Sequence, residues 1–134
     1  MGDVRHMNNA AQSSVFRRLL RWLVLIAFII VALLYLNSSI YSAWVSGGPP
    51  NPDPLGWSRR ATGHLCFALA TLFFGVGLFK GINTFPRATK GAAAFIVLGS
   101  LLALSPYIGR FALIDKCLDR GGSWNRETIQ CTDE

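Results

Sequence analysis

Three long apolar stretches, each bounded by charged or aromatic residues, dominate the pattern of hydrophobic and polar positions along this chain. They cover residues 22–44, 61–79 and 91–109 and contain no Asp, Glu, Lys or Arg. At about 1.5 Å per helical residue, each is long enough to cross a hydrocarbon core of about 30 Å. Because backbone polar groups inside lipid must be satisfied internally, each stretch is predicted to be a helix. The predicted fold class is an all-α membrane protein with three transmembrane helices.

The segments around these stretches complete the predicted organisation. Transmembrane helices are expected over 19–44, 61–79 and 91–109, with an N-terminal segment (1–18), two loops (45–60 and 80–90) and a tail (110–134). The first 14 residues are mostly small and polar, and we expect them to be disordered. The 45–60 loop holds four prolines and three glycines, which favour an extended, polyproline-like path.

The first apolar stretch could also belong to a cleaved signal peptide. Its uninterrupted part, residues 22–36, reaches the upper limit of about 15 residues for the apolar region of such a peptide. The stretch then continues through Tyr41 without an Ala-x-Ala cleavage site, although small polar residues after Leu36 leave cleavage open. Trp22 and Trp44 resemble interfacial aromatic anchors, which favours a retained helix.

Charge adds a prediction of topology. The chain has a net charge of +6, and seven of its 13 basic residues precede residue 22 or lie between residues 80 and 90, where Asp3 is the one acidic residue. The other segments have no net charge. By the positive-inside rule, the N-terminus and the 80–90 loop are cytoplasmic, and the 45–60 loop and the tail lie outside. The basic excess is thus explained by topology, and nucleic-acid binding is not expected.

The cysteines agree with this topology. Cys66 lies inside the second helix, where a thiol behaves as a small hydrophobe. Cys117 and Cys131 both lie in the tail, and such a pair in an oxidising compartment predicts a disulfide. The bridge would close a 15-residue loop and stabilise the tail by about 3 kcal/mol. A metal site is the weaker alternative, because the tail has no His and no third Cys. No cofactor is expected.

The loop closed by these cysteines begins with Cys-Leu-Asp-Arg-Gly-Gly-Ser-Trp-Asn. Gly121 and Gly122 permit a tight reversal, and Asn125 can close a second turn, so we expect a helix end followed by a small hairpin. Residues 115–131 resemble the periplasmic end piece of many small bacterial membrane and secreted proteins, some of which are immunity proteins. The three-helix layout is also similar to immunity proteins against membrane-acting type VI secretion effectors. The resemblance implies a bacterial inner-membrane protein that neutralises a toxin.

Residues suited to catalysis or ion transport are scarce. The chain has two histidines, His6 and His64, and no carboxylate inside a predicted helix. We find no nucleophile–base set, no phosphate-binding glycine loop and no intramembrane acid that would mark a proton pathway. An enzyme, a secondary transporter or a pore is therefore not expected.

Polar residues gather instead at the predicted outer ends of the helices. Their ordinary interpretation is polarity near the lipid headgroups, and their functional interpretation is a cup that binds another protein. The candidate partner-binding residues are Asn37, His64 and Tyr107, together with the aromatic anchors Trp57 and Trp124. The small-residue pairs Thr71/Gly75 and Gly99/Ala103 are predicted to pack helices, either within one chain or in a homo-oligomer.

Two functions fit these observations. In the first, the protein is an immunity protein that neutralises a membrane-acting, pore-forming toxin from the periplasmic side. In the second, it is an accessory or assembly subunit of a larger membrane complex. In both, the chain contacts membrane lipid and a protein partner.

Overall fold

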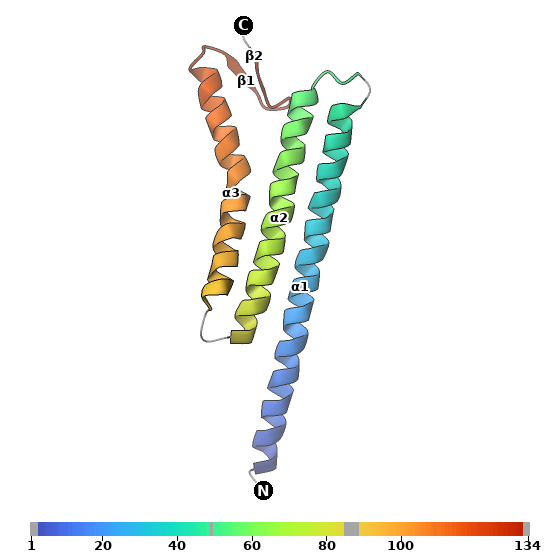
Figure 1. Cartoon of the computed structure of the whole chain (residues 1–134), viewed down its shortest axis with the longest axis vertical. Coiled ribbons are helices and arrows are strands. Elements are labelled where there is room, and N and C mark those ends of the chain that lie inside the picture. The colour runs from blue at the N-terminus through green and yellow to red at the C-terminus, as the bar shows by residue number, and fades with distance from the viewer. Residues whose placement is uncertain (1–2, 49, 85–88, 133–134) are drawn as a thin grey trace.

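The structure, a computed structural model, describes residues 3–48, 50–84 and 89–132. It consists of three helices, α1 (Asp3–Gly47), α2 (Pro54–Thr84) and α3 (Lys90–Leu118), and an antiparallel hairpin of β1 (Ser123–Asn125) and β2 (Gln130–Thr132) (Figure 1). All three helices are long and apolar enough to cross a membrane. The predicted fold class, a three-helix membrane protein with a disulfide-stapled tail, is confirmed.

The helices form an open layer with α2 in the middle (Figure 1). The principal interfaces are α1 with α2 and α2 with α3. In the most apolar part of each helix, 22% of the residues of α2 are buried, against 6% for α1 and 11% for α3. Most apolar side chains of the outer two helices therefore face outward, as expected where lipid is the solvent.

Glycines set the closest approaches between helices. A Cβ atom at Gly75 of α2 would lie 2.8 Å from the Cβ atom of Phe28 on α1. A Cβ atom at Gly99 of α3 would lie 3.2 Å from the carbonyl oxygen of Ala70 on α2. Small residues allow backbones to approach closely, and these two glycines of the predicted small-residue pairs pack helices of the same chain.

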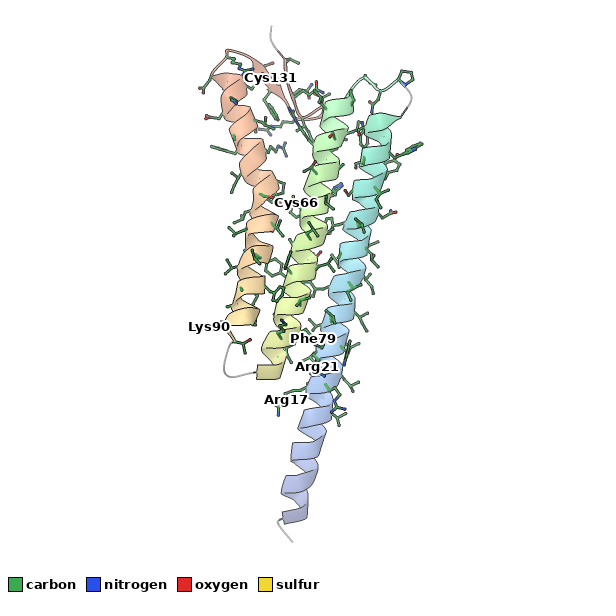
Figure 2. The ribbon with its side chains drawn as sticks, viewed as in Figure 1. Arg17, Arg21, Cys66, Phe79, Lys90 and Cys131 are labelled. Atoms are coloured by element: carbon green, nitrogen blue, oxygen red, sulfur yellow. A yellow bond between two sulfur atoms is a disulfide. The ribbon has the colours of Figure 1, made fainter. Side chains whose placement is uncertain are left out.

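Aromatic and basic side chains mark the end of the layer opposite the tail. The Arg21 guanidinium lies 5.0 Å from the ring centre of Phe79 (Figure 2). The Trp22 ring meets the same Phe79 ring edge-on, with ring centres 5.2 Å apart. The Lys80 ammonium lies 4.6 Å from the Phe95 ring. In the Arg21 and Lys80 contacts an apolar ring lies against a cationic group, a combination that suits the boundary between hydrocarbon and water.

The helices extend beyond the predicted spans. The disorder expected over the first 14 residues is wrong for residues 3–14, which belong to α1. Residues 3–46 contain neither Gly nor Pro, so no strong helix breaker separates this segment from the apolar stretch. At the other end of the chain, α3 continues to Leu118, so the first part of the 110–134 tail is helical.

The loop predicted over 45–60 is shorter than expected, because α1 ends at Gly47 and α2 begins at Pro54. The Asp53 carboxylate accepts a hydrogen bond from the Gly56 backbone N–H at 2.9 Å. Asp is a favoured N-cap, and proline suits the first helical position, where its missing N–H costs no hydrogen bond. Pro54 therefore starts a helix here instead of preventing one.

Pro106 lies inside α3, where it cannot donate to the carbonyl of Leu102. The neighbouring Ser105 hydroxyl donates to that carbonyl at 2.9 Å. The side chain thus satisfies the acceptor that proline leaves open, which allows the helix to continue through this position.

Candidate functional site

The tail forms a small cap over the end of α2 and α3, defined here as residues 119–132. A disulfide joins Cys117 at the end of α3 to Cys131 of β2, with 2.00 Å between sulfur atoms and 5.6 Å between Cα atoms. In the hairpin, Trp124 pairs with Cys131. The Asn125 side chain accepts hydrogen bonds from the backbone N–H groups of the next turn, at 2.8 and 3.2 Å. The predicted disulfide, hairpin and Asn125 turn are all confirmed.

The turn from α3 into the cap depends on Gly121. Its φ of +77° is in the left-handed region that favours glycine. The Gly121 N–H donates to the Leu118 carbonyl at 2.9 Å, and the Gly122 N–H donates to the Cys117 carbonyl at 3.1 Å. These are the two hydrogen bonds of a Schellman motif, which ends a helix and satisfies its last carbonyls. The cap therefore begins at a fixed angle to α3.

The cap is also held on the first turns of α2. Arg59 donates to the carbonyl of Ile129, and Arg60 donates to the carbonyl of Glu127. The Gln130 side-chain amide donates to the Asp53 carboxylate. These three contacts, together with the disulfide, attach the cap to two helices at once. Sequence reasoning missed this docking, because the partners are about 70 residues apart and no local pattern connects them.

Gly56 allows this close docking. A Cβ atom there would collide with the Thr128 carbonyl oxygen of the cap and with the Asp53 carboxylate. Ile129, next to that carbonyl, has a φ of +56°, which is a strained conformation for a β-branched residue. Two hydrogen bonds hold it there: its carbonyl accepts from Arg59, and the side chain of the next residue, Gln130, donates to Asp53. The part of the cap that contacts α2, residues 127–130, is thus tightly constrained.

Beneath the cap lies a cleft of about 520 Å³ between α2 and α3. Its walls include Phe67 and Cys66 of α2, Pro106 and Leu113 of α3, and Ile129 of the cap. Arg59 and Arg110 also line it. In Figure 2, Cys66 lies on α2 well below Cys131, which places the cleft within the upper part of the helical layer.

A second hollow of about 440 Å³, here called the upper groove, adjoins the cleft, since Arg59 and Leu113 line both. Trp124 and the disulfide form part of its wall. The Trp124 indole nitrogen is buried and has no acceptor among the described residues. The charged residues that line the groove are basic: Lys116 and Arg120, in addition to Arg59.

Two of the five predicted partner-binding residues lie in one aromatic cluster. The Tyr107 ring meets Phe67 edge-on at 5.9 Å, and Tyr35 of α1 lies 5.6 Å from Phe67 and 6.3 Å from His64. The His64 Nδ1 atom is buried without a partner in the part of the chain that the structure describes. This cluster joins all three helices below the cap, which is a packing role.

The other three predicted residues lie apart from that cluster. Trp57 contacts Tyr41 on α1, with ring centres 6.3 Å apart, and its ring is covered by the Arg60 guanidinium at 4.8 Å. Trp124 belongs to the upper groove. Asn37 is exposed on α1. The predicted partner-binding residues are therefore spread over several faces of the tail end.

The hydroxyl groups near the tail end favour the ordinary interpretation over a polar cup. Five of them donate to carbonyls three or four residues back in their own helices: Ser38, Ser42, Ser46, Thr62 and Ser105. Ser39 is buried and donates to the Ala61 carbonyl of α2 at 2.8 Å. These hydroxyls satisfy helical backbone or join helices.

Comparisons of the chain with protein-family models, curated proteins and solved structures give no match. The resemblance of residues 115–131 to immunity proteins remains a prediction from those residues.

Proposed function

We propose that this chain is a non-enzymatic inner-membrane protein that binds a protein partner at its tail end. The partner that best fits the resemblance is a membrane-acting, pore-forming toxin, which would make the chain an immunity protein. The observation that carries the proposal is the doubly attached cap, joined to α3 by the Cys117–Cys131 disulfide and to α2 through Arg59 and Arg60.

A fixed cap favours recognition because less conformational freedom is lost when a partner binds it. Two tryptophans lie at this end, Trp57 beside α1 and Trp124 in the hairpin. Both are partly exposed. Tryptophan is enriched among the residues that dominate binding energy, so these side chains are the expected anchors of a partner.

The proposal requires the cap to lie on the periplasmic side. Alkaline phosphatase fused after the last residue is expected to be active, and the same enzyme fused within residues 83–89 is expected to be inactive. The reason is the basic residues before residue 22 and between residues 80 and 90, which favour the cytoplasm. Enzyme activity normalised to fusion protein level provides the measurement, and the reverse pattern would contradict the orientation.

Replacing Trp57 or Trp124 by Ala is expected to weaken protection of the cell. Each change should reduce partner affinity by about 2 kcal/mol, or roughly thirtyfold, if both residues are anchors. The measurement is survival of a gene-deletion strain, complemented with each variant, in competition with its toxin-delivering parent. Trp22→Ala, at the opposite end of the molecule, is the matched control and should protect like the unchanged protein.

The deletion strain itself separates the two candidate functions. An immunity protein is dispensable until a toxin arrives, whereas loss of an assembly subunit leaves its complex defective without any attacker. If deletion cells survive the competition and retain their membrane potential as well as complemented cells, the immunity proposal is wrong. A membrane complex that fails to assemble in unchallenged deletion cells would favour the accessory-subunit alternative.

A further inference from the structure

The cleft and the upper groove together form one surface with a strong charge bias. Four basic residues line the two hollows: Arg59, Arg110, Lys116 and Arg120. No Asp or Glu is among the residues that line either one. Within the described part of the chain, no ion pair neutralises Arg110. A lining of one sign favours an anionic ligand.

The position of Arg110 relates this charge to the membrane. Lys90 begins α3, and Arg110 lies 20 residues further along the same helix. At about 1.5 Å per residue, these two charges are roughly 30 Å apart, which is the thickness of the hydrocarbon core. If Lys90 lies at one boundary of the bilayer, Arg110 lies at the level of the headgroups of the other leaflet.

The lower part of the cleft is apolar. Cys66, Phe67 and Pro106 contribute to its walls, and the Ser105 hydroxyl there donates to a carbonyl of its own helix. Deeper in the layer, beyond the residues that line the cleft, α3 lies close to α2 at Gly99 and Ala70. Tyr107, which also lines the cleft, is 64% exposed, so the cleft opens toward the side of α3 that faces lipid. The lining thus changes from cationic at the headgroup level to apolar below it.

We propose that this cleft is a binding site for an anionic phospholipid of the tail-side leaflet. Arg110 and the remaining donors of Arg59 bind the phosphate, since a guanidinium carries five donors and Arg59 gives one of them to Ile129. The first methylenes of an acyl chain lie against Phe67 and Pro106. The volume of about 520 Å³ suits a headgroup with the beginning of its chains. This site does not depend on the proposed toxin partner.

The first test measures lipid binding by native mass spectrometry of the purified, disulfide-bonded protein. Phosphatidylglycerol and phosphatidylcholine with identical acyl chains are added in turn. We expect the anionic lipid to bind more tightly, and Arg110→Gln to weaken it about tenfold, as for loss of one charge-assisted hydrogen bond. Arg126→Gln is the matched control, because it removes the same charge from the cap outside both hollows and should change binding less than twofold.

The second test needs no variant and uses Cys66, which lines the cleft and is outside the disulfide. Phosphatidylglycerol should slow the alkylation of Cys66 by a maleimide in detergent, and phosphatidylcholine at the same concentration should not. Inorganic phosphate serves as the probe for a site that takes the free anion, and it should give no protection.

The proposal is overturned if the two lipids bind equally tightly, or if Arg110→Gln and Arg126→Gln lose the same affinity for phosphatidylglycerol. It is also overturned if phosphatidylglycerol leaves the alkylation rate of Cys66 unchanged. If inorganic phosphate protects Cys66 and phosphatidylglycerol does not, the arginines bind a soluble anion, and the lipid site is overturned as well. If Arg110→Gln fails to fold, the alkylation experiment on the unchanged protein still decides.

Discussion

Replacing Gly99 by Leu is expected to lower the free energy of unfolding of the helical layer by about 1–3 kcal/mol, the usual cost of overpacking. A single added carbon at Gly99 already lies 3.2 Å from the Ala70 carbonyl oxygen, and the side chains of Phe73 and Phe74 surround it. Backbone atoms cannot rotate away as a side chain can, so α2 and α3 must separate. Thermal unfolding in detergent micelles, followed by circular dichroism, measures the change.

Gly91→Leu is the matched control for this substitution, because it adds the same side chain to the same helix. No heavy atom lies within 4 Å of a Cβ atom at Gly91, and the position is exposed. The midpoint of thermal unfolding of Gly91→Leu should remain close to that of the unchanged protein. Equal stability of the Gly99 and Gly91 variants would show that α2 and α3 do not pack through Gly99.

Removing the disulfide is expected to open the cap while the helices stay folded. In the double variant Cys117→Ser, Cys131→Ser, trypsin should cleave after Arg120 and Arg126 about a hundredfold faster. That factor corresponds to the roughly 3 kcal/mol expected for a closed 15-residue loop, when cleavage follows the population of the open cap. The measurement is the rate of trypsin cleavage of the detergent-solubilised protein, read by mass spectrometry.

Cys66→Ser is the control for this experiment, since Cys66 lies on α2 outside the disulfide. Its cleavage rate should match that of the unchanged protein. If the double variant is cleaved no faster than the control, the contacts of the cap with α2 suffice to order it and the disulfide has no such role.

The sequence predicted those parts of the fold that depend on local pattern and on the solvent. The three spans follow from uninterrupted apolar runs, and the hairpin follows from Gly121, Gly122 and Asn125. The early start of α2 had a local signal as well, because Asp53 followed by Pro54 is a favourable N-cap and first helical position. The other prolines of the loop, however, favour an extended path, which is what the prediction followed.

The parts that were missed depend on contacts between distant segments. Docking of the cap requires Arg59 to meet Ile129 and Gln130 to meet Asp53, and neither pair can be inferred without the path of the chain between them. The polar residues predicted to gather at one end do lie near the tail, yet most of their hydroxyls bond to their own helices and that of Ser39 joins α1 to α2. Ser105 illustrates why, since its hydroxyl replaces the hydrogen bond that Pro106 cannot make.

The cap is fixed to α2 as well as to α3, and hydrogen–deuterium exchange of its backbone amides can measure the contribution of α2. In the double variant Arg59→Gln, Arg60→Gln, with the disulfide intact, exchange across residues 119–132 should be about tenfold faster, because two charge-assisted hydrogen bonds to the cap are lost. The double variant Arg18→Gln, Arg126→Gln removes the same charge and should exchange like the unchanged protein. Equal exchange in all three proteins would contradict a cap held by two helices.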